Sequence, residues 1–100
     1  MSLFRLLILT PERAVFSGGV ESLDVPASDG RTGILANHAA MISGLSRGEV
    51  RARMPGGWVR SWSISEGFLQ VLENEVVVLT SGAASLQPSP RESSRPSRSP

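Results

Sequence analysis

The sequence predicts an all-β domain, either a sandwich or a small barrel. Strand-like runs separated by turn residues recur every eight to twelve residues through the first 84 residues. No stretch shows the sustained 3.6-residue period of a long helix. With 100 residues, of which 40% are hydrophobic, the chain has room for one modest core. We therefore expect a single folded domain built from short strands.

The first strands are predicted on either side of a glycine-containing turn. Residues 3–9 form an apolar run that stops at Thr10-Pro11. Val15-Phe16 leads into Ser17-Gly18-Gly19, where we expect a turn. Residues 20–25 then alternate between apolar and polar side chains, which is the pattern of a strand with one buried face.

The middle of the chain is predicted to be irregular. Pro26 suits the end or the edge of a strand because it cannot donate a backbone hydrogen bond. Residues 28–33 have the composition of a polar, exposed loop whose two glycines adopt positive φ. Residues 39–42 favour a helix by propensity alone, but Ser43-Gly44 ends it too soon for stability.

Two hairpins are predicted in the second half, because apolar strands there are separated by short turn sequences. They join residues 50–54 to 58–64 across a proline–glycine turn, and residues 68–72 to 76–80 across residues 73–75.

The composition changes at the end of the chain. Residues 84–100 hold six serines, four prolines and three arginines. Such a segment cannot bury enough apolar surface to offset its chain entropy. We therefore expect a folded domain over residues 1–84 and a disordered tail over residues 85–100.

Several classes of protein are excluded by composition. The chain has no cysteine and one histidine, which excludes a disulfide framework and makes a metal site improbable. The longest apolar stretch, residues 3–9, contains Arg5 and is far shorter than the roughly 20 residues of a membrane-spanning helix. It also lacks the pattern of a signal peptide, so we expect a protein of the cytoplasm or an organelle matrix.

The sequence offers no catalytic constellation. His38 is the one histidine, and pairing it with Asp29 or Ser43 is a weak hypothesis for a hydrolytic site. The glycines of residues 28–33 are not followed by the Lys-Ser/Thr of a phosphate-binding loop. We therefore expect no enzymatic activity, no cofactor and no metal.

The hairpin over residues 47–62, together with the basic tail, supports an alternative function. It carries four arginines beside Trp58 and Trp62, which are the residue types of a single-stranded nucleic-acid-binding surface. The competing interpretation is that both tryptophans fill the core and the arginines form a solvated face. Residues 1–82 hold seven arginines and eight carboxylates, so this part of the chain is slightly negative, which favours the second interpretation because nucleic-acid-binding domains are usually basic.

Four segments taken in order resemble one family. They are residues 9–18 (LTPERAVFSG), 30–39 (GRTGILANHA), 65–71 (SEGFLQV) and 76–80 (VVVLT). Their order and spacing are similar to those of the epsilon subunit of the F-type ATP synthase, in its N-terminal β-sandwich domain. The resemblance implies a two-sheet β-sandwich of about eight to ten short strands.

The resemblance also implies a function. Members of this family bind the gamma subunit and the c-ring in the central stalk, and help to couple proton transport to ATP synthesis without an active site of their own. The expected location is peripheral, on the cytoplasmic side of a bacterial inner membrane. Neither nucleic acid nor a small-molecule substrate is expected as a partner.

The resemblance assigns contact residues position by position. For the c-ring they are Ser28, Asp29, Gly30, Arg31 and Gly33. For the gamma subunit they are Thr10, Asn37, His38, Ser43 and Ser65.

The sequence departs from the family pattern in several places. Arg31 stands where the family usually has an acidic residue, so a positive charge would meet the basic loop of an unchanged ring. Ala36 and Ala40 replace two prolines, and Glu66 replaces a glycine. These changes leave open a degenerate copy that folds but does not assemble. The Ser/Pro/Arg tail stands where the family usually has a helical hairpin, so we expect no inhibition of ATP hydrolysis by C-terminal helices.

Overall fold

A computed structural model describes residues 2–87, and this part of the chain contains ten strands and no helix. The strands are β1 (Phe4–Leu9), β2 (Ala14–Val20), β3 (Ser22–Ala27), β4 (Gly30–Leu35), β5 (Met41–Leu45), β6 (Gly48–Arg53), β7 (Val59–Ile64), β8 (Gly67–Leu72), β9 (Glu75–Thr80) and β10 (Ala83–Ser85).

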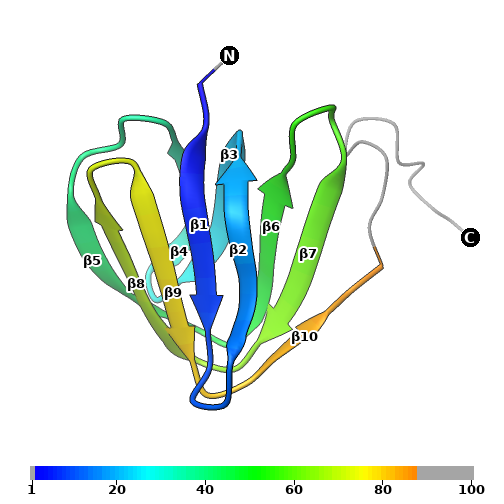
Figure 1. Ribbon diagram of the computed structural model, residues 1–100. Helices are drawn as coiled ribbons and strands as arrows, with labels where there is room; N and C mark the ends of the chain where they lie inside the picture. Colours follow the sequence, from blue (N-terminus) through cyan, green and yellow to red (C-terminus); the bar gives the residue numbers. More distant parts are fainter. Residues whose placement is uncertain (1, 88–100) are drawn as a thin grey trace, which may run out of the picture.

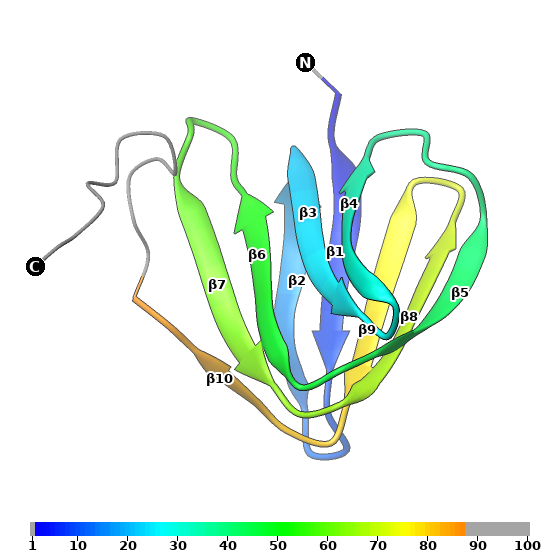
Figure 2. The same cartoon turned by 180° about the vertical axis from the view of Figure 1, so that it is seen from behind.

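The strands pack as two layers (Figure 1, Figure 2). The first layer contains β10, β7, β6, β3 and β4, and the second contains β5, β8, β9, β1 and β2. One pair, Ala27 with Leu45, connects β3 to β5 at the corner where the layers meet. The prediction of a two-sheet β-sandwich is confirmed.

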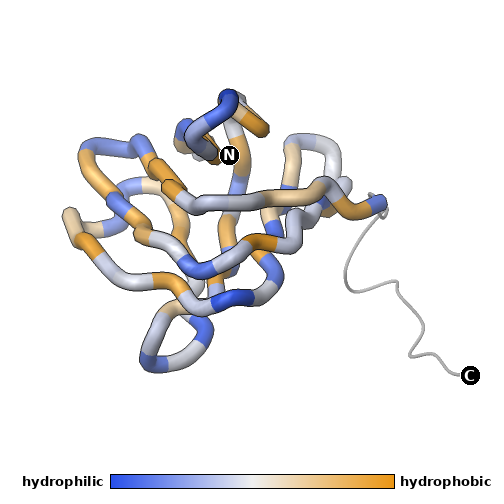
Figure 3. The backbone as a smooth tube through the Cα atoms, turned by 90° about the horizontal axis from the view of Figure 1, so that it is seen from below, coloured by the Kyte–Doolittle hydropathy of each residue, from blue (hydrophilic) through white to orange (hydrophobic). Residues whose placement is uncertain are grey.

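The core lies between the layers because successive side chains of each strand point to opposite faces. In β1, Leu6 and Ile8 are buried, whereas Leu7 and Leu9 face outward and are partly exposed. Figure 3 shows hydrophobic and hydrophilic residues alternating along much of the tube. The largest fully buried side chains are Trp62, Leu6, Ile8, Leu23, Ile34, Ile64 and Leu69.

A group of three side chains joins the layers at the side away from the β3–β5 corner. Phe16 of β2 meets Trp62 of β7, with ring centroids 5.0 Å apart. The guanidinium of Arg60 lies 5.0 Å from the Trp62 ring and 5.3 Å from the Phe16 ring. We call these three residues the side-chain seam. The Nε atom of Arg60 and the Nε1 atom of Trp62 are buried there without a hydrogen-bond partner among residues 2–87.

The turn predicted at residues 17–19 is wrong, because β2 runs through all three. Ser17, Gly18 and Gly19 pair with Leu7, Leu6 and Arg5 of β1. A Cβ on Gly18 would lie 3.0 Å from the ring of Phe16. The missing side chain therefore makes room for an aromatic ring within the strand.

The loop predicted over residues 28–33 is also shorter than expected. Gly30 has a φ of 129° and makes the turn, but Gly33 is not among the residues with positive φ. Gly33 belongs to β4, where it pairs with Asp24. Pro26 lies one residue before the end of β3, where it pairs with Arg31.

The helix considered for residues 39–42 does not form. Met41 and Ile42 begin β5, where they pair with Val71 and Gln70 of β8. Pairing with a neighbouring strand outweighs the helix propensity of two alanines and a methionine.

The two hairpins of the second half are confirmed. β8 and β9 are joined by Glu73 and Asn74, whose φ values are 51° and 62°. Two consecutive positive φ values characterise a type I′ turn, which suits the twist of paired strands.

The chain continues as β10 after these hairpins. β10 pairs with β7 through Ser85, and the amide of Leu86 donates to the carbonyl of Ser61 at 2.9 Å. Most of the predicted tail, residues 88–100, lies outside the described residues.

Candidate functional site

The outer surface of the second layer is apolar across four strands. One row of paired residues runs from Phe68 through Leu79 to Leu9. The next row contains Ile42 of β5, Val77 of β9 and Leu7 of β1, and the polar Gln70 of β8 lies between Ile42 and Val77. Residues that pair side by side point to the same face of a sheet. We call the six apolar residues of these two rows the apolar face.

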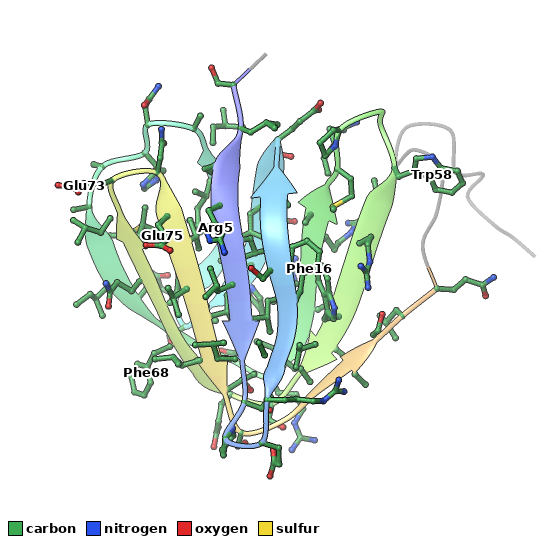
Figure 4. All side chains as sticks on the ribbon, in the orientation of Figure 1. Arg5, Phe16, Trp58, Phe68, Glu73 and Glu75 are labelled. Carbon is green, nitrogen blue, oxygen red and sulfur yellow. The ribbon has the colours of Figure 1, made fainter. Side chains whose placement is uncertain are left out.

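Three side chains of the apolar face are exposed, and the other three, Leu7, Leu9 and Val77, are half-buried. Ile42 is 77% exposed, Phe68 62% and Leu79 47%. Figure 4 shows Phe68 projecting away from the sheet into solvent. Toward the start of β1 the face ends at Arg5, which pairs with Glu75 at 3.8 Å and donates to Ser17 at 3.0 Å. Contiguous exposed apolar surface of this kind usually marks a binding site.

A groove of about 870 Å³ extends the apolar face at the end where β1 and β9 finish. Leu9, Phe68 and Leu79 form its apolar wall. Thr10, Ser28, Glu66 and Ser81 are among its polar residues, and they come from the turns at that end. A partner that covers the apolar face could therefore also reach into this groove.

The outer surface of the first layer is charged. Arg31 of β4 lies against Asp24 of β3, with Nη2 and Oδ2 3.1 Å apart. The same Nη2 donates to the backbone carbonyl of Glu49 at 2.9 Å. Arg31 is therefore bound within the chain, and its positive charge is balanced by Asp24. The two outer surfaces of the sandwich thus differ in chemistry.

The residues predicted to contact the c-ring lie along the β3–β4 hairpin. Ser28, Asp29 and Gly30 are exposed at its tip, and Gly33 is exposed within β4. Arg31 is also exposed, but its guanidinium is turned onto the first layer. The tip lies beside β5, since the amide of Ser28 donates to the carbonyl of Gly44 at 3.0 Å.

The residues predicted to contact gamma do not form one cluster. Thr10 lines the groove, together with Ser28 from the predicted c-ring set. Ser65 lies at the same end, where its amide donates to the carbonyl of Gly82. Ser43 pairs with the buried Leu69, so its half-buried side chain points inward, away from the apolar face.

Asn37 and His38 lie at the other end of the sandwich. β4 runs from Gly30 to Leu35, so these two residues follow its far end. Asn37 accepts and donates hydrogen bonds with Asn74 in the β8–β9 turn. The amide of His38 donates to the carbonyl of Leu35 at 3.2 Å, which closes a tight turn.

The placement of His38 gives no support to a hydrolytic site. Asp29 directly precedes β4 and His38 follows its other end, and the hydroxyl of Ser43 donates to the carbonyl of Gly44 at 3.1 Å. Within residues 2–87 no group of three or more His, Cys, Asp or Glu side chains could hold a metal ion. Within the same residues no helix is long and apolar enough to cross a membrane.

The nucleic-acid hypothesis loses one of its two stacking residues. Trp62 is fully buried, whereas Trp58 is 52% exposed at the turn between β6 and β7. The interpretation that both tryptophans fill the core is therefore correct for Trp62 and wrong for Trp58. A single exposed tryptophan does not provide successive stacking positions for bases.

Sequence reasoning missed the apolar face. A strand in a sandwich with one solvated side should alternate strictly between apolar and polar residues. Residues 6–9 and 76–79 are apolar at odd and at even positions alike, which indicates that both faces of these strands avoid water. This pattern was the available signal for a covered outer surface.

Comparison with known proteins identifies the family. The family described as ATP synthase, Delta/Epsilon chain, beta-sandwich domain matches residues 3–85. The chain belongs to this delta/epsilon family.

Curated relatives of the delta/epsilon family agree with the match. The chain is 40% identical over 83 residues to the ATP synthase epsilon chain of Ruminiclostridium cellulolyticum, covering 83% of this chain and 61% of that protein. It is 37% identical over 76 residues to the chloroplastic epsilon chain of Emiliania huxleyi, covering 76% and 58%. The chain thus spans about three fifths of the length of these relatives.

Two solved structures share the delta/epsilon fold. One is the Euglena gracilis mitochondrial ATP synthase, solved with OSCP, F1 and the c-ring. A chain of that structure matches with a TM-score of 0.80 and 22% sequence identity, and the match covers 85% of this chain and 54% of that one. The other is the central stalk and c-ring of the Tetrahymena thermophila mitochondrial ATP synthase, with a TM-score of 0.67 and 12% identity, over 80% and 64%. At these identities the likeness concerns the fold.

Proposed function

We propose that this chain is a non-catalytic central-stalk subunit of a rotary ATP synthase. It links the gamma subunit to the c-ring and so helps to couple proton transport to ATP synthesis. The observation that carries the proposal is the apolar face, on a chain that belongs to the delta/epsilon family.

The gamma subunit is the proposed partner of the apolar face. Ile42, Phe68 and Leu79 are large side chains held on a paired sheet, so they lose little backbone freedom when a partner covers them. The groove beside them adds the predicted gamma contact Thr10. A standard interface of about 1,600 Å² in total would cover this face and part of the groove.

The c-ring is the proposed partner of the β3–β4 tip. Asp29 is exposed there, whereas the charge of Arg31 is balanced by Asp24. The positive charge that distinguishes this sequence from the family is thereby withdrawn from the tip. A partner loop carrying basic or neutral polar residues fits this surface.

The remaining features of the proposal concern the context of the subunit. It has no active site, needs no cofactor, and is peripheral on the cytoplasmic side of a bacterial inner membrane. The stalk domain covers residues 1–84, and β10 extends its backbone pairing through Ser85.

Binding to the cognate gamma subunit tests the proposal. We expect the 100-residue chain to form a stable complex, and the double variant Ile42→Ser/Phe68→Ser to weaken it at least about tenfold, since buried aromatic anchors dominate interfaces. Both side chains are exposed, so the thermal midpoint of the free chain should hardly change. Dissociation constants by titration calorimetry and midpoints by circular dichroism give the two readouts.

Trp58→Ser is the matched control, because Trp58 is exposed but lies outside the apolar face. Equal binding by wild type and the double variant contradicts the assigned face. A folded wild-type chain that does not bind gamma supports a degenerate copy. Binding to single-stranded nucleic acid that falls steeply with salt supports the alternative function.

A further inference from the structure

Asn74 connects three elements at the end of the sandwich away from the groove. It is the second residue of the β8–β9 turn, and its backbone carbonyl accepts a hydrogen bond from the amide of Arg5 at 2.9 Å. Its side-chain Oδ1 accepts a bond from the amide of Asn37 at 2.6 Å. Its Nδ2 donates to Oδ1 of Asn37 at 3.2 Å. One turn residue thus holds β1 and the β4–β5 loop together.

The two bonds to Asn37 form a reciprocal pair that we call the asparagine clasp. Asn37 itself has a φ of 66°, a conformation that asparagine tolerates better than most residues. The other hydrogen bonds of this loop are local, from His38 to Leu35 and to Ala39. In the described part of the chain, the clasp is therefore the hydrogen-bonded link from this loop to a distant strand turn.

The clasp lies beside His38. The turn from Leu35 to His38 is closed by the bond between the amide of His38 and the carbonyl of Leu35. Ala36 packs against the core and anchors one side of the turn. The clasp anchors the other side, at the residue directly before His38.

We propose that Asn74 is a positioning residue for the Asn37–His38 loop in gamma binding. This inference rests on the proposed function and on the prediction, made from the family resemblance, that Asn37 and His38 contact gamma. Asn74 acts on the partner only through Asn37. A loop fixed before binding loses less conformational freedom in the complex, so the clasp raises affinity by pre-organisation.

Asn74→Gly separates this role from the role of Asn74 in its turn. Glycine adopts positive φ without steric cost and is preferred at this position of a type I′ turn. The variant therefore keeps the β8–β9 turn and the backbone bond to Arg5, and removes both bonds of the clasp. Asn74→Asp keeps an acceptor for the amide of Asn37 but loses the donor.

Glu73→Gly is the matched control. Glu73 is the other turn residue, has a φ of 51°, and is exposed. Both glycine variants change the same turn, but only one of them removes the clasp.

Two measurements on the full-length chain test the inference. Amide hydrogen exchange of the free chain should show faster exchange at Asn37 in Asn74→Gly, and wild-type exchange in Glu73→Gly. Calorimetric titration with gamma should show about tenfold weaker binding for Asn74→Gly. The loss should come from a less favourable entropy of binding. Asn74→Asp should lie between wild type and Asn74→Gly.

The outcomes distinguish this inference from the proposed function. Wild-type affinity for gamma in Asn74→Gly, or unchanged exchange at Asn37, overturns the role of Asn74 but leaves the proposed function unaffected. A wild-type chain that does not bind gamma overturns the proposed function and the role of the clasp in binding, even where the exchange data show the clasp itself.

Discussion

Gly67 begins β8 at a point where two backbones come together. A Cβ at this position would overlap the backbone oxygen of Leu79, which cannot move without disturbing β9. At the residue scale, this contact explains why Gly67 is retained although its neighbour Glu66 departs from the family pattern. Glu66 is exposed and has room for a side chain.

We expect Gly67→Ala to lower the free energy of unfolding by about 1–3 kcal/mol, the usual cost of overpacking. Gly33→Ala is the control, because nothing lies within 4 Å of a Cβ at Gly33. The control should change stability by less than about 0.5 kcal/mol. Urea unfolding followed by circular dichroism measures both, and equal stability of the two variants contradicts the clash.

At the scale of elements, β10 decides where the folded domain ends. Its pairing covers residues 83–85 along the edge of β7, and Leu86 adds a further backbone bond. Without β10, the edge of β7 loses the hydrogen bonds that satisfy its backbone groups. The segment is short, but it belongs to the stability of the first layer.

We therefore expect a chain ending at Gly82 to be less stable than one ending at Gln87. The loss should be about 1–2 kcal/mol, since each net hydrogen bond contributes about 0.5–1.5 kcal/mol. Thermal unfolding of the two truncated chains provides the comparison. Matching midpoints would show that β10 adds nothing to the folded domain.

The elements also show what the sequence allowed us to predict. The hairpins of the second half and the first strand were predictable, because apolar runs and turn residues coincide there. β2 and β5 were not, because the glycines of β2 serve packing against Phe16 and the strand character of β5 comes from pairing with β8. Local propensity contains neither kind of information.

The candidate site was harder to predict than the fold. Phe68 and Leu69 are neighbours in the sequence, yet one is exposed and the other is buried. The polar Gln70 shares a face with Phe68, so the alternation indicates which face is the outer one, but it does not show that Phe68, Leu79 and Leu9 become neighbours on that face. The groove is harder still to predict, since Thr10 and Ser28 line it together only when the two layers pack against each other.

At the scale of the whole molecule, the two layers are joined along two sides. Backbone pairing of Ala27 with Leu45 joins them at the corner, and the side-chain seam joins them opposite. The seam contains no interlayer backbone pairing, so it depends on aromatic contact and on Arg60.

We expect Phe16→Ala to destabilise the fold by about 2 kcal/mol, because Phe16 is half-buried against Trp62. Phe16→Leu, which keeps most of the apolar volume, should cost less. In a Trp58→Phe background Trp62 is the one tryptophan, so its fluorescence reports on the seam directly. An emission spectrum unchanged by Phe16→Ala would contradict a closed seam.

The position of β1 has a consequence for how the protein is made. β1 lies between β2 and β9, and its parallel pairing with β9 joins residues 5–9 to residues 75–79. The second layer is therefore incomplete until nearly the whole domain has left the ribosome. Contacts so distant along the chain slow folding and leave apolar strands unpaired during synthesis. The nascent chain consequently needs protection from aggregation until its last long strand emerges.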